Sequence, residues 1–261
     1  MPVSINQALA AGHRPGRVAR ASAGRLLIAG ATGVLGNAVL QRVVGMQRFM
    51  HTSVLATQAI APGLRTVSAQ VVQGDVSSWQ AADPSHAHHC AIVMFDPPRM
   101  FYDRERALWC PAPEQLGALA AWLHASGVRT LAVVLPHAQG SLPEALKRGL
   151  ASLDEHALAA VGFERLLIVR TAQKPAAASH SNMLHGLAAW MLGITRMMVP
   201  SNEQPVRATK VAELVDLVLL HMPLGTWVAA PELVWQAAQG DVAHMREVVL
   251  DWLGVDRKEA V

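Results

Sequence analysis

The feature that most constrains the fold is a glycine-rich segment, Gly30-Ala31-Thr32-Gly33-Val34-Leu35-Gly36. It follows a short apolar run, residues 25–29, and precedes residues 38–44, whose apolar positions have helical spacing. A strand that turns sharply at a glycine into a helix directs the free N–H groups and the positive end of the helix dipole towards an anion. Glycine at the second position lets a diphosphate approach the backbone, and glycine at the third lets helix and strand pack closely. The segment therefore predicts a dinucleotide-binding turn.

Further apolar runs alternate with helical patterns along the chain. The predicted strands are residues 53–57, 67–72, 91–95, 130–135, 165–170 and 226–229, and the predicted helices are 113–126, 142–158, 182–198, 209–221, 231–239 and 241–253. This alternation predicts an α/β fold, a doubly wound parallel sheet of the Rossmann type with helices on both faces. After Thr171 the alternation loosens, and we expect a small C-terminal substrate lobe from about residue 175.

Composition supports one elaborated domain, residues 24–261, after a flexible N-terminal extension, residues 1–23. The chain has 261 residues, of which 52% are hydrophobic and 16% charged. No run of about 18 uncharged apolar residues occurs, so we expect no membrane-spanning helix. Cys90 and Cys110 are the only cysteines, too few for a disulfide framework, which favours a reducing, cytoplasmic setting.

Charge is distributed unevenly, because the first acidic residue is Asp75 and seven arginines precede it. A basic end can indicate nucleic-acid binding. These arginines are scattered, and no aromatic residues are interleaved with them. We therefore expect a small, phosphate-rich ligand and no nucleic acid.

The spacing Gly-x-x-Gly-x-x-Gly resembles that of the extended and atypical short-chain dehydrogenase/reductase superfamily, which includes the NmrA-like regulators. Three other segments are similar to that superfamily. The first is Val72-Gln73-Gly74-Asp75-Val76, whose aspartate would contact the adenine amino group. The second is residues 127–133, at the start of the fifth predicted strand, and the third is residues 206–212, before a C-terminal helix. The resemblance covers roughly residues 25–239. Asp75 has an alternative interpretation as a helix N-cap.

The resemblance implies a nicotinamide dinucleotide as cofactor. The residues expected to bind it are Gly30, Thr32, Gly33, Val34, Leu35, Gly36, Thr57, Gln58, Asp75, Val76, Phe95, Asp96, Pro136 and Thr171. NAD-preferring domains place an acid near the end of the second strand, where it binds the ribose 2′-hydroxyl. No acid precedes Asp75, which favours NADP over NAD. Arg48, His51 and Arg65 are cationic candidates for a 2′-phosphate, although none stands at that strand end.

The superfamily's catalytic Tyr-x-x-x-Lys motif is absent. The single tyrosine, Tyr102, follows the wrong strand, and Arg106 stands where the lysine would be. His137, just after the fifth main strand, and Lys147 are the replacement candidates. An imidazole can exchange a proton near neutral pH. The alternatives are a loop histidine and a solvated helix lysine without catalytic roles.

Two other clusters have structural alternatives. Residues 86–90, His-Ala-His-His-Cys, contain zinc-ligand types, but the spacing is too tight for four ligands around one ion, so we expect no metal. Met191, Met197 and Met198, with Trp190, could contact an apolar ligand, the core or a second copy in a homodimer.

Two functions are compatible with these features. The first is an NADP-dependent oxidoreductase acting on a small apolar carbonyl or enone. The second is a non-catalytic, dinucleotide-sensing regulatory protein of the NmrA type. The missing tyrosine favours the sensor, whereas the apolar C-terminal lobe favours the enzyme.

Overall fold

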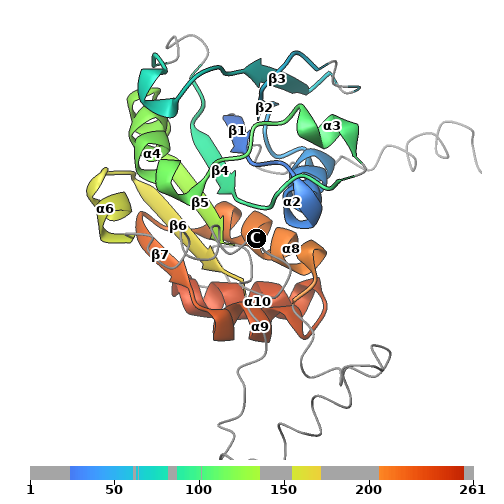
Figure 1. Ribbon diagram of the computed structural model, residues 1–261. Coiled ribbons are helices and arrows are strands. Elements are labelled where there is room, and N and C mark those ends of the chain that lie inside the picture. Colours follow the sequence, from blue (N-terminus) through green and yellow to red (C-terminus); the bar gives the residue numbers. More distant parts are fainter. Residues whose placement is uncertain are drawn as a thin grey trace, which may run out of the picture.

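A computed structural model describes residues 24–60, 63, 65–81, 87–100, 102–135, 155–171 and 206–255. Within these ranges, seven parallel strands form one sheet in the order β3-β2-β1-β4-β5-β6-β7 (Figure 1). The strands are β1 (Arg25–Ala29), β2 (His51–Ala56), β3 (Val67–Val71), β4 (Cys90–Met94), β5 (Thr130–Leu135), β6 (Arg165–Arg170) and β7 (Gly225–Ala229). The order reverses between β1 and β4, which confirms the predicted doubly wound Rossmann arrangement.

The central strands are apolar because both of their faces are covered. Leu26 and Ile28 of β1 pack in one buried cluster, and Leu27 and Ala29 pack in a second cluster on the opposite face. This division follows from the alternation of side chains along a strand. The register places Ile28 opposite Val54 on one side and opposite Ile92 on the other.

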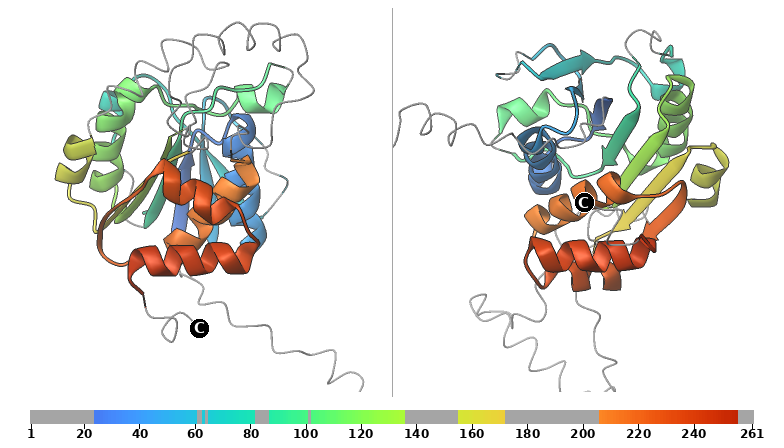
Figure 2. Two further views of the ribbon diagram at one scale, coloured as in Figure 1. Left: turned by 90° about the horizontal axis from the view of Figure 1, so that it is seen from below. Right: turned by 180° about the vertical axis from the view of Figure 1, so that it is seen from behind.

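Helices cover both faces, as Figure 2 shows. One face carries α2 (Gly33–Met46), α8 (Ala208–His221), α9 (Pro231–Ala238) and α10 (Val242–Leu253). The other face carries η1 (Val76–Ser78), α4 (Leu116–Ala125) and α6 (Glu155–Ala160). The helix predicted over 113–126 is divided into η3 (Pro113–Gln115) and α4.

Residues 206–255 belong to the same layered structure as the first half of the chain. β7 pairs in parallel with β6, and α8 packs along α2. An ion pair also joins the two helices, because Asp216 of α8 lies 3.0 Å from Arg42 of α2. Asp216 lies 3.0 Å from Arg48 as well, just beyond the end of α2. The helix predicted over 182–198, with its methionines, lies outside the described residues. Among the described helices, none is long and apolar enough to cross a bilayer.

Candidate functional site

The glycine turn joins β1 to α2 at the carboxyl edge of the sheet. Gly30 has a φ of +75°, and a Cβ there would lie 2.0 Å from the carbonyl oxygen of Met94. At Gly36 a Cβ would lie 2.5 Å from the carbonyl oxygen of Gly30. The first glycine therefore permits the turn, and the third lets α2 pack closely on β1.

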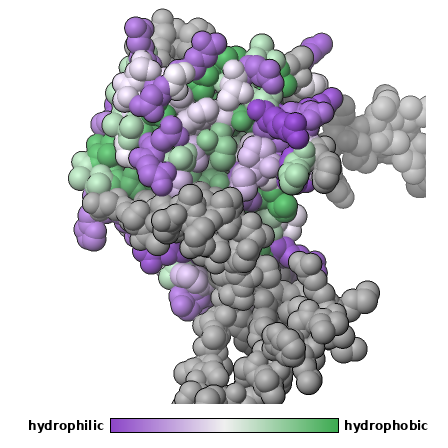
Figure 3. All heavy atoms as spheres, viewed as in Figure 1, coloured by the Kyte–Doolittle hydropathy of each residue, from purple (hydrophilic) through white to green (hydrophobic). Residues whose placement is uncertain are grey.

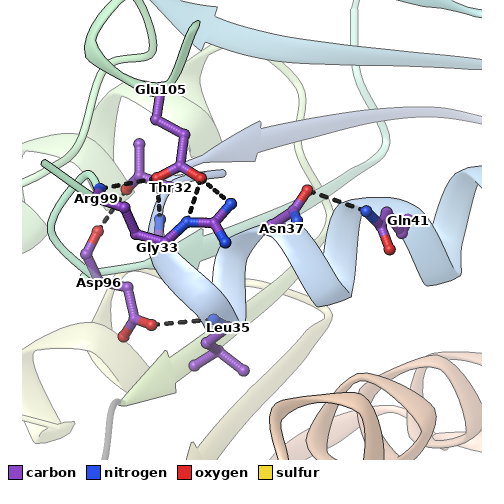
Figure 4. A network of polar contacts seen from close by, with 8 residues as sticks. All are labelled: Thr32, Gly33, Leu35, Asn37, Gln41, Asp96, Arg99 and Glu105. Carbon is purple, nitrogen blue, oxygen red and sulfur yellow. Dashed lines mark hydrogen bonds and ion pairs between the residues drawn. The ribbon is translucent and has the colours of Figure 1, made fainter. Parts of the chain in front are cut away.

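The N–H groups at the start of α2 are bound by two carboxylates of the chain itself (Figure 4). The Gly33 N–H donates to Oε2 of Glu105 at 3.0 Å, and the Leu35 N–H donates to Oδ2 of Asp96 at 3.0 Å. The Thr32 hydroxyl donates to the backbone carbonyl of Asp96. These carboxylates stabilise the positive end of the helix dipole, which is the place that a bound phosphate takes in dinucleotide-binding turns.

Glu105 lies on α3 (Asp103–Arg106), a single helical turn, and is buried. Besides Gly33, its carboxylate accepts hydrogen bonds from the backbone N–H of Arg99 at 2.9 Å and from Nε of Arg99 at 2.8 Å, and it forms an ion pair with that guanidinium. The guanidinium also lies 3.7 Å from the centre of the Tyr102 ring. Burial acts to raise the pKa of Glu105, but the bonds from Arg99 and Gly33 outweigh it and hold the pKa below its ordinary value.

Asp96 is the second residue after β4, which lies next to β1 in the sheet. Burial raises the pKa of Asp96, and the nearby charge of Glu105 acts in the same direction, whereas the bond from Leu35 lowers it. The Cys110 thiol donates to the Asp96 carbonyl at 3.3 Å. Both carboxylates at the start of α2 therefore accept a backbone N–H of that helix, but only Glu105 is also paired with a cation, Arg99.

Residues 96–100 and 102–110, which we name the covering segment, cross the carboxyl ends of β1 and β2. The Gly30 N–H donates to the Trp109 carbonyl at 3.1 Å, and the Thr57 N–H donates to the Ala107 carbonyl at 2.8 Å. An antiparallel bridge joins Ala56 to Leu108. In the glycine turn, only Val34 is exposed, at 61%, and the other six residues are buried.

Aromatic packing fixes the end of this segment. The ring of Trp109 meets that of Trp79 edge to face at 5.0 Å, and Trp79 meets Trp122 of α4 in the same manner at 5.1 Å. Aromatic pairs in this geometry add to the stability that area burial gives. Over α3, in contrast, hydrophilic side chains gather at the surface (Figure 3), and the Asp103 side chain is 94% exposed.

Asp75 is at the N-cap of η1, the alternative that the sequence left open. It is exposed and accepts a hydrogen bond from the Ser77 hydroxyl, which lowers its pKa. The next residue, Val76, is 3% exposed and packs in the core. The Asp75 side chain makes no cap hydrogen bond to the backbone of η1, and its predicted contact with adenine stays a prediction.

Of the remaining predicted cofactor residues, those that the structure describes lie at the same edge. Thr57 and Gln58 follow β2 directly and are exposed, whereas Phe95 at the end of β4 is 1% exposed. Thr171 follows β6, and its hydroxyl donates to the Leu135 carbonyl at 2.9 Å. Pro136, His137 and Lys147 lie outside the described residues.

The candidate cations for a 2′-phosphate lie elsewhere. Arg48 is paired with Asp216, and burial lowers its pKa. His51 begins β2, at the opposite edge of the sheet, where its Nε2 lies 2.7 Å from the Ser68 hydroxyl. Arg65 precedes β3 and is exposed. As arranged, these three residues do not form a 2′-phosphate site at the end of β2.

In this arrangement, the N–H groups that a diphosphate would use at the glycine turn are occupied by two carboxylates of the chain. A Cβ at Gly33 would lie 2.6 Å from Cβ of Asp96 and 3.0 Å from the carbonyl oxygen of Pro97, so the space in front of Gly33 is filled by the chain. The sequence did not indicate Glu105 and Arg99 as parts of this site. Their signal is weak, because Asp103-Arg104-Glu105-Arg106 has the alternating charges of a solvated segment.

The described residues contain no group of three or more histidine, cysteine, aspartate or glutamate side chains placed to hold a metal ion. His88 is buried, and its Nε2 lies 2.9 Å from the Ser53 hydroxyl. His86 is outside the described residues.

Comparisons with known proteins show similarity in fold. No family model matches the chain, and no curated protein does. MoeE5 in complex with UDP-glucuronic acid and NAD is 13% identical, with a TM-score of 0.47 over 88% of this chain and 83% of that one. The Bordetella bronchiseptica enzyme WbmF in complex with NAD+ is 9% identical, with a TM-score of 0.47 over 91% and 80%. A short-chain dehydrogenase/reductase superfamily protein from Agrobacterium tumefaciens with bound NAD is 15% identical, with a TM-score of 0.45 over 88% and 83%.

Proposed function

We propose that this protein is a dinucleotide-responsive regulatory protein, which binds NADP(H) in preference to NAD(H) and changes the position of the covering segment when it does so. The observation that carries the proposal is the pair of hydrogen bonds from Gly33 and Leu35 to Glu105 and Asp96. A ligand that uses those two N–H groups must displace the two carboxylates. The displacement supplies the conformational change that a regulatory protein passes to a partner.

The topology supports binding at the carboxyl end of β1. In open parallel sheets, ligands bind outside the carboxyl ends of the strands, where the strand order reverses. The order reverses between β1 and β4, and the glycine turn follows β1. Absence of a carboxylate at the end of β2, where Thr57 and Gln58 lie, supports the preference for a 2′-phosphate.

The surroundings of Tyr102 favour regulation over reduction. In the resembling enzymes, tyrosine transfers a proton while a lysine lowers its pKa. Tyr102 is 51% exposed and belongs to the covering segment, beneath the Arg99 guanidinium. The oxidoreductase alternative, acting on a small apolar carbonyl or enone, depends on His137 and Lys147, both outside the described residues.

Thermal unfolding with each of NADPH, NADP+, NADH and NAD+ tests the proposal, because a ligand that binds the folded chain raises its Tm. We expect NADPH or NADP+ to raise the Tm most, and a panel of carbonyls to leave NADPH oxidation at the rate seen in buffer. Failure of all four nucleotides to raise the Tm would overturn dinucleotide binding. Protein-dependent NADPH oxidation that is lost in His137→Ala would instead establish the oxidoreductase.

A further inference from the structure

The donors that surround Glu105 form an anion-binding set. Its carboxylate accepts hydrogen bonds from the Gly33 N–H at the start of α2, the Arg99 N–H, and the Arg99 guanidinium. Backbone N–H groups at a helix N-terminus together with an arginine are the donors that hold phosphate groups in proteins. Here a buried carboxylate of the same chain takes the place of the ligand.

A second carboxylate extends the likeness to a diphosphate. Asp96 reaches the Leu35 N–H from the side of β4, while Glu105 reaches the Gly33 N–H from α3, so two acids approach one helical turn from opposite sides (Figure 4). One residue, Val34, separates their partners along α2. Farther along the covering segment, the carbonyl groups of Ala107 and Trp109 accept hydrogen bonds from the N–H groups of Thr57 and Gly30, respectively.

The fold predicts a diphosphate at the glycine turn, whereas two carboxylates of the chain occupy its N–H groups. We therefore propose that Asp96 and Glu105 are internal diphosphate mimics that hold the glycine turn closed. The covering segment is then an autoinhibitory element, which a ligand displaces when its phosphates take the Gly33 and Leu35 N–H groups. Displacing Glu105 also frees the Arg99 guanidinium to pair with a phosphate. This inference rests on the proposed function for the identity of the ligand, but not for the competition itself.

The competition predicts that neutral variants of the mimics bind phosphates more tightly. Glu105→Gln and Asp96→Asn keep the shape of each side chain and remove its charge. Because hydrogen bonds to a neutral acceptor are about half as strong, the internal hydrogen bonds should weaken. We expect NADPH and inorganic pyrophosphate to bind Glu105→Gln at least about tenfold more tightly than the wild type, as measured by calorimetry. Asp103→Asn is the matched control, because it removes a charge from the same helix at an exposed position and should bind as the wild type does.

A second measurement separates the possible failures. Circular dichroism establishes that each variant is folded, and the ¹⁵N–¹H resonances of Gly33 and Leu35 report whether their N–H groups change partner. Wild-type binding of NADPH without tighter binding by either variant would overturn the mimicry, and with it the displacement of the covering segment, but would leave dinucleotide binding intact. Binding of pyrophosphate but not NADPH by Glu105→Gln would support the mimicry and contradict the proposed function. If the folded variants bound neither compound, both would be wrong.

Discussion

Gly33 lies where α2 and the covering segment meet, and its backbone has a φ of +68°. From the sequence, this glycine is explained by the approach of a diphosphate. In the structure, the neighbour that requires it is Asp96, whose Cβ would lie 2.6 Å from a new Cβ. The residue type was therefore predictable from the motif, but the group that contacts it was not, because that group lies more than sixty residues away in the chain.

Substitution of Gly33 should destabilise the fold even without ligand. Gly33→Ala places a side chain on a backbone with positive φ and too close to Cβ of Asp96, so we expect a loss of about 1–3 kcal/mol in the free energy of unfolding. Gly45→Ala, on the same helix with open space around it, should instead gain about 0.5–1 kcal/mol. Urea unfolding of the two variants measures the difference. Equal free energies of unfolding would show that the covering segment makes no close contact with Gly33.

Glu105 should make stability depend on pH in a defined direction. Its pKa in the folded chain is below the ordinary value, so its contribution is present above the unfolded-state pKa and is lost as the pH falls through the folded-state pKa. At about pH 7 we expect the wild type to exceed Glu105→Gln by about 1–3 kcal/mol, and at about pH 3 the difference should shrink. Urea unfolding at the two pH values checks this, with Asp103→Asn as control. A difference that grew on acidification would contradict a stabilising role for the ionised Glu105 carboxylate.

At the scale of elements, α2 is positioned by α8 as well as by the sheet. Asp216 is 3% exposed and lies between Arg42 and Arg48. Removing its charge leaves the arginines without this partner, and breaking a buried ion pair destabilises strongly. We expect Asp216→Asn to lose on the order of 2–4 kcal/mol, measured by urea unfolding. Glu164→Gln removes an exposed partner of Arg129 and should lose less than about 0.5 kcal/mol. Comparable losses would mean that the α2–α8 ion pairs contribute little.

The covering segment carries its own reporter, Cys110. Burial raises the pKa of Cys110, and burial raises the pKa of Cys90 in β4 to about 12, so both thiols should react slowly with iodoacetamide at neutral pH. Displacement of the segment should speed labelling of Cys110 and leave Cys90 unchanged, as mass spectrometry can follow. Glu105→Gln should show faster labelling without ligand. Acceleration at Cys90 as well would indicate general unfolding.

At the scale of the whole molecule, the periodic features were predictable and the long-range contacts were not. Apolar runs such as 25–29 and 130–135 predicted buried strands because only buried parallel strands are apolar on both faces. The alternation of strands and helices predicted a doubly wound parallel sheet, and the structure places its reversal between β1 and β4. In contrast, α3 is one turn long, and its alternating charges do not indicate that Glu105 is buried while Asp103 is exposed. That choice depends on Arg99 and on the start of α2, which are close only after folding.

The central claim is that one segment of the chain occupies the place of the dinucleotide's phosphates. Hydrogen–deuterium exchange with and without saturating NADPH tests it most directly, because exchange reports local opening. We predict faster exchange in residues 96–106 when NADPH is bound, with unchanged or slower exchange in residues 30–36. NADPH that binds with no change, or with slower exchange, in residues 96–106 would show that the ligand binds without displacing the segment, which would contradict the account.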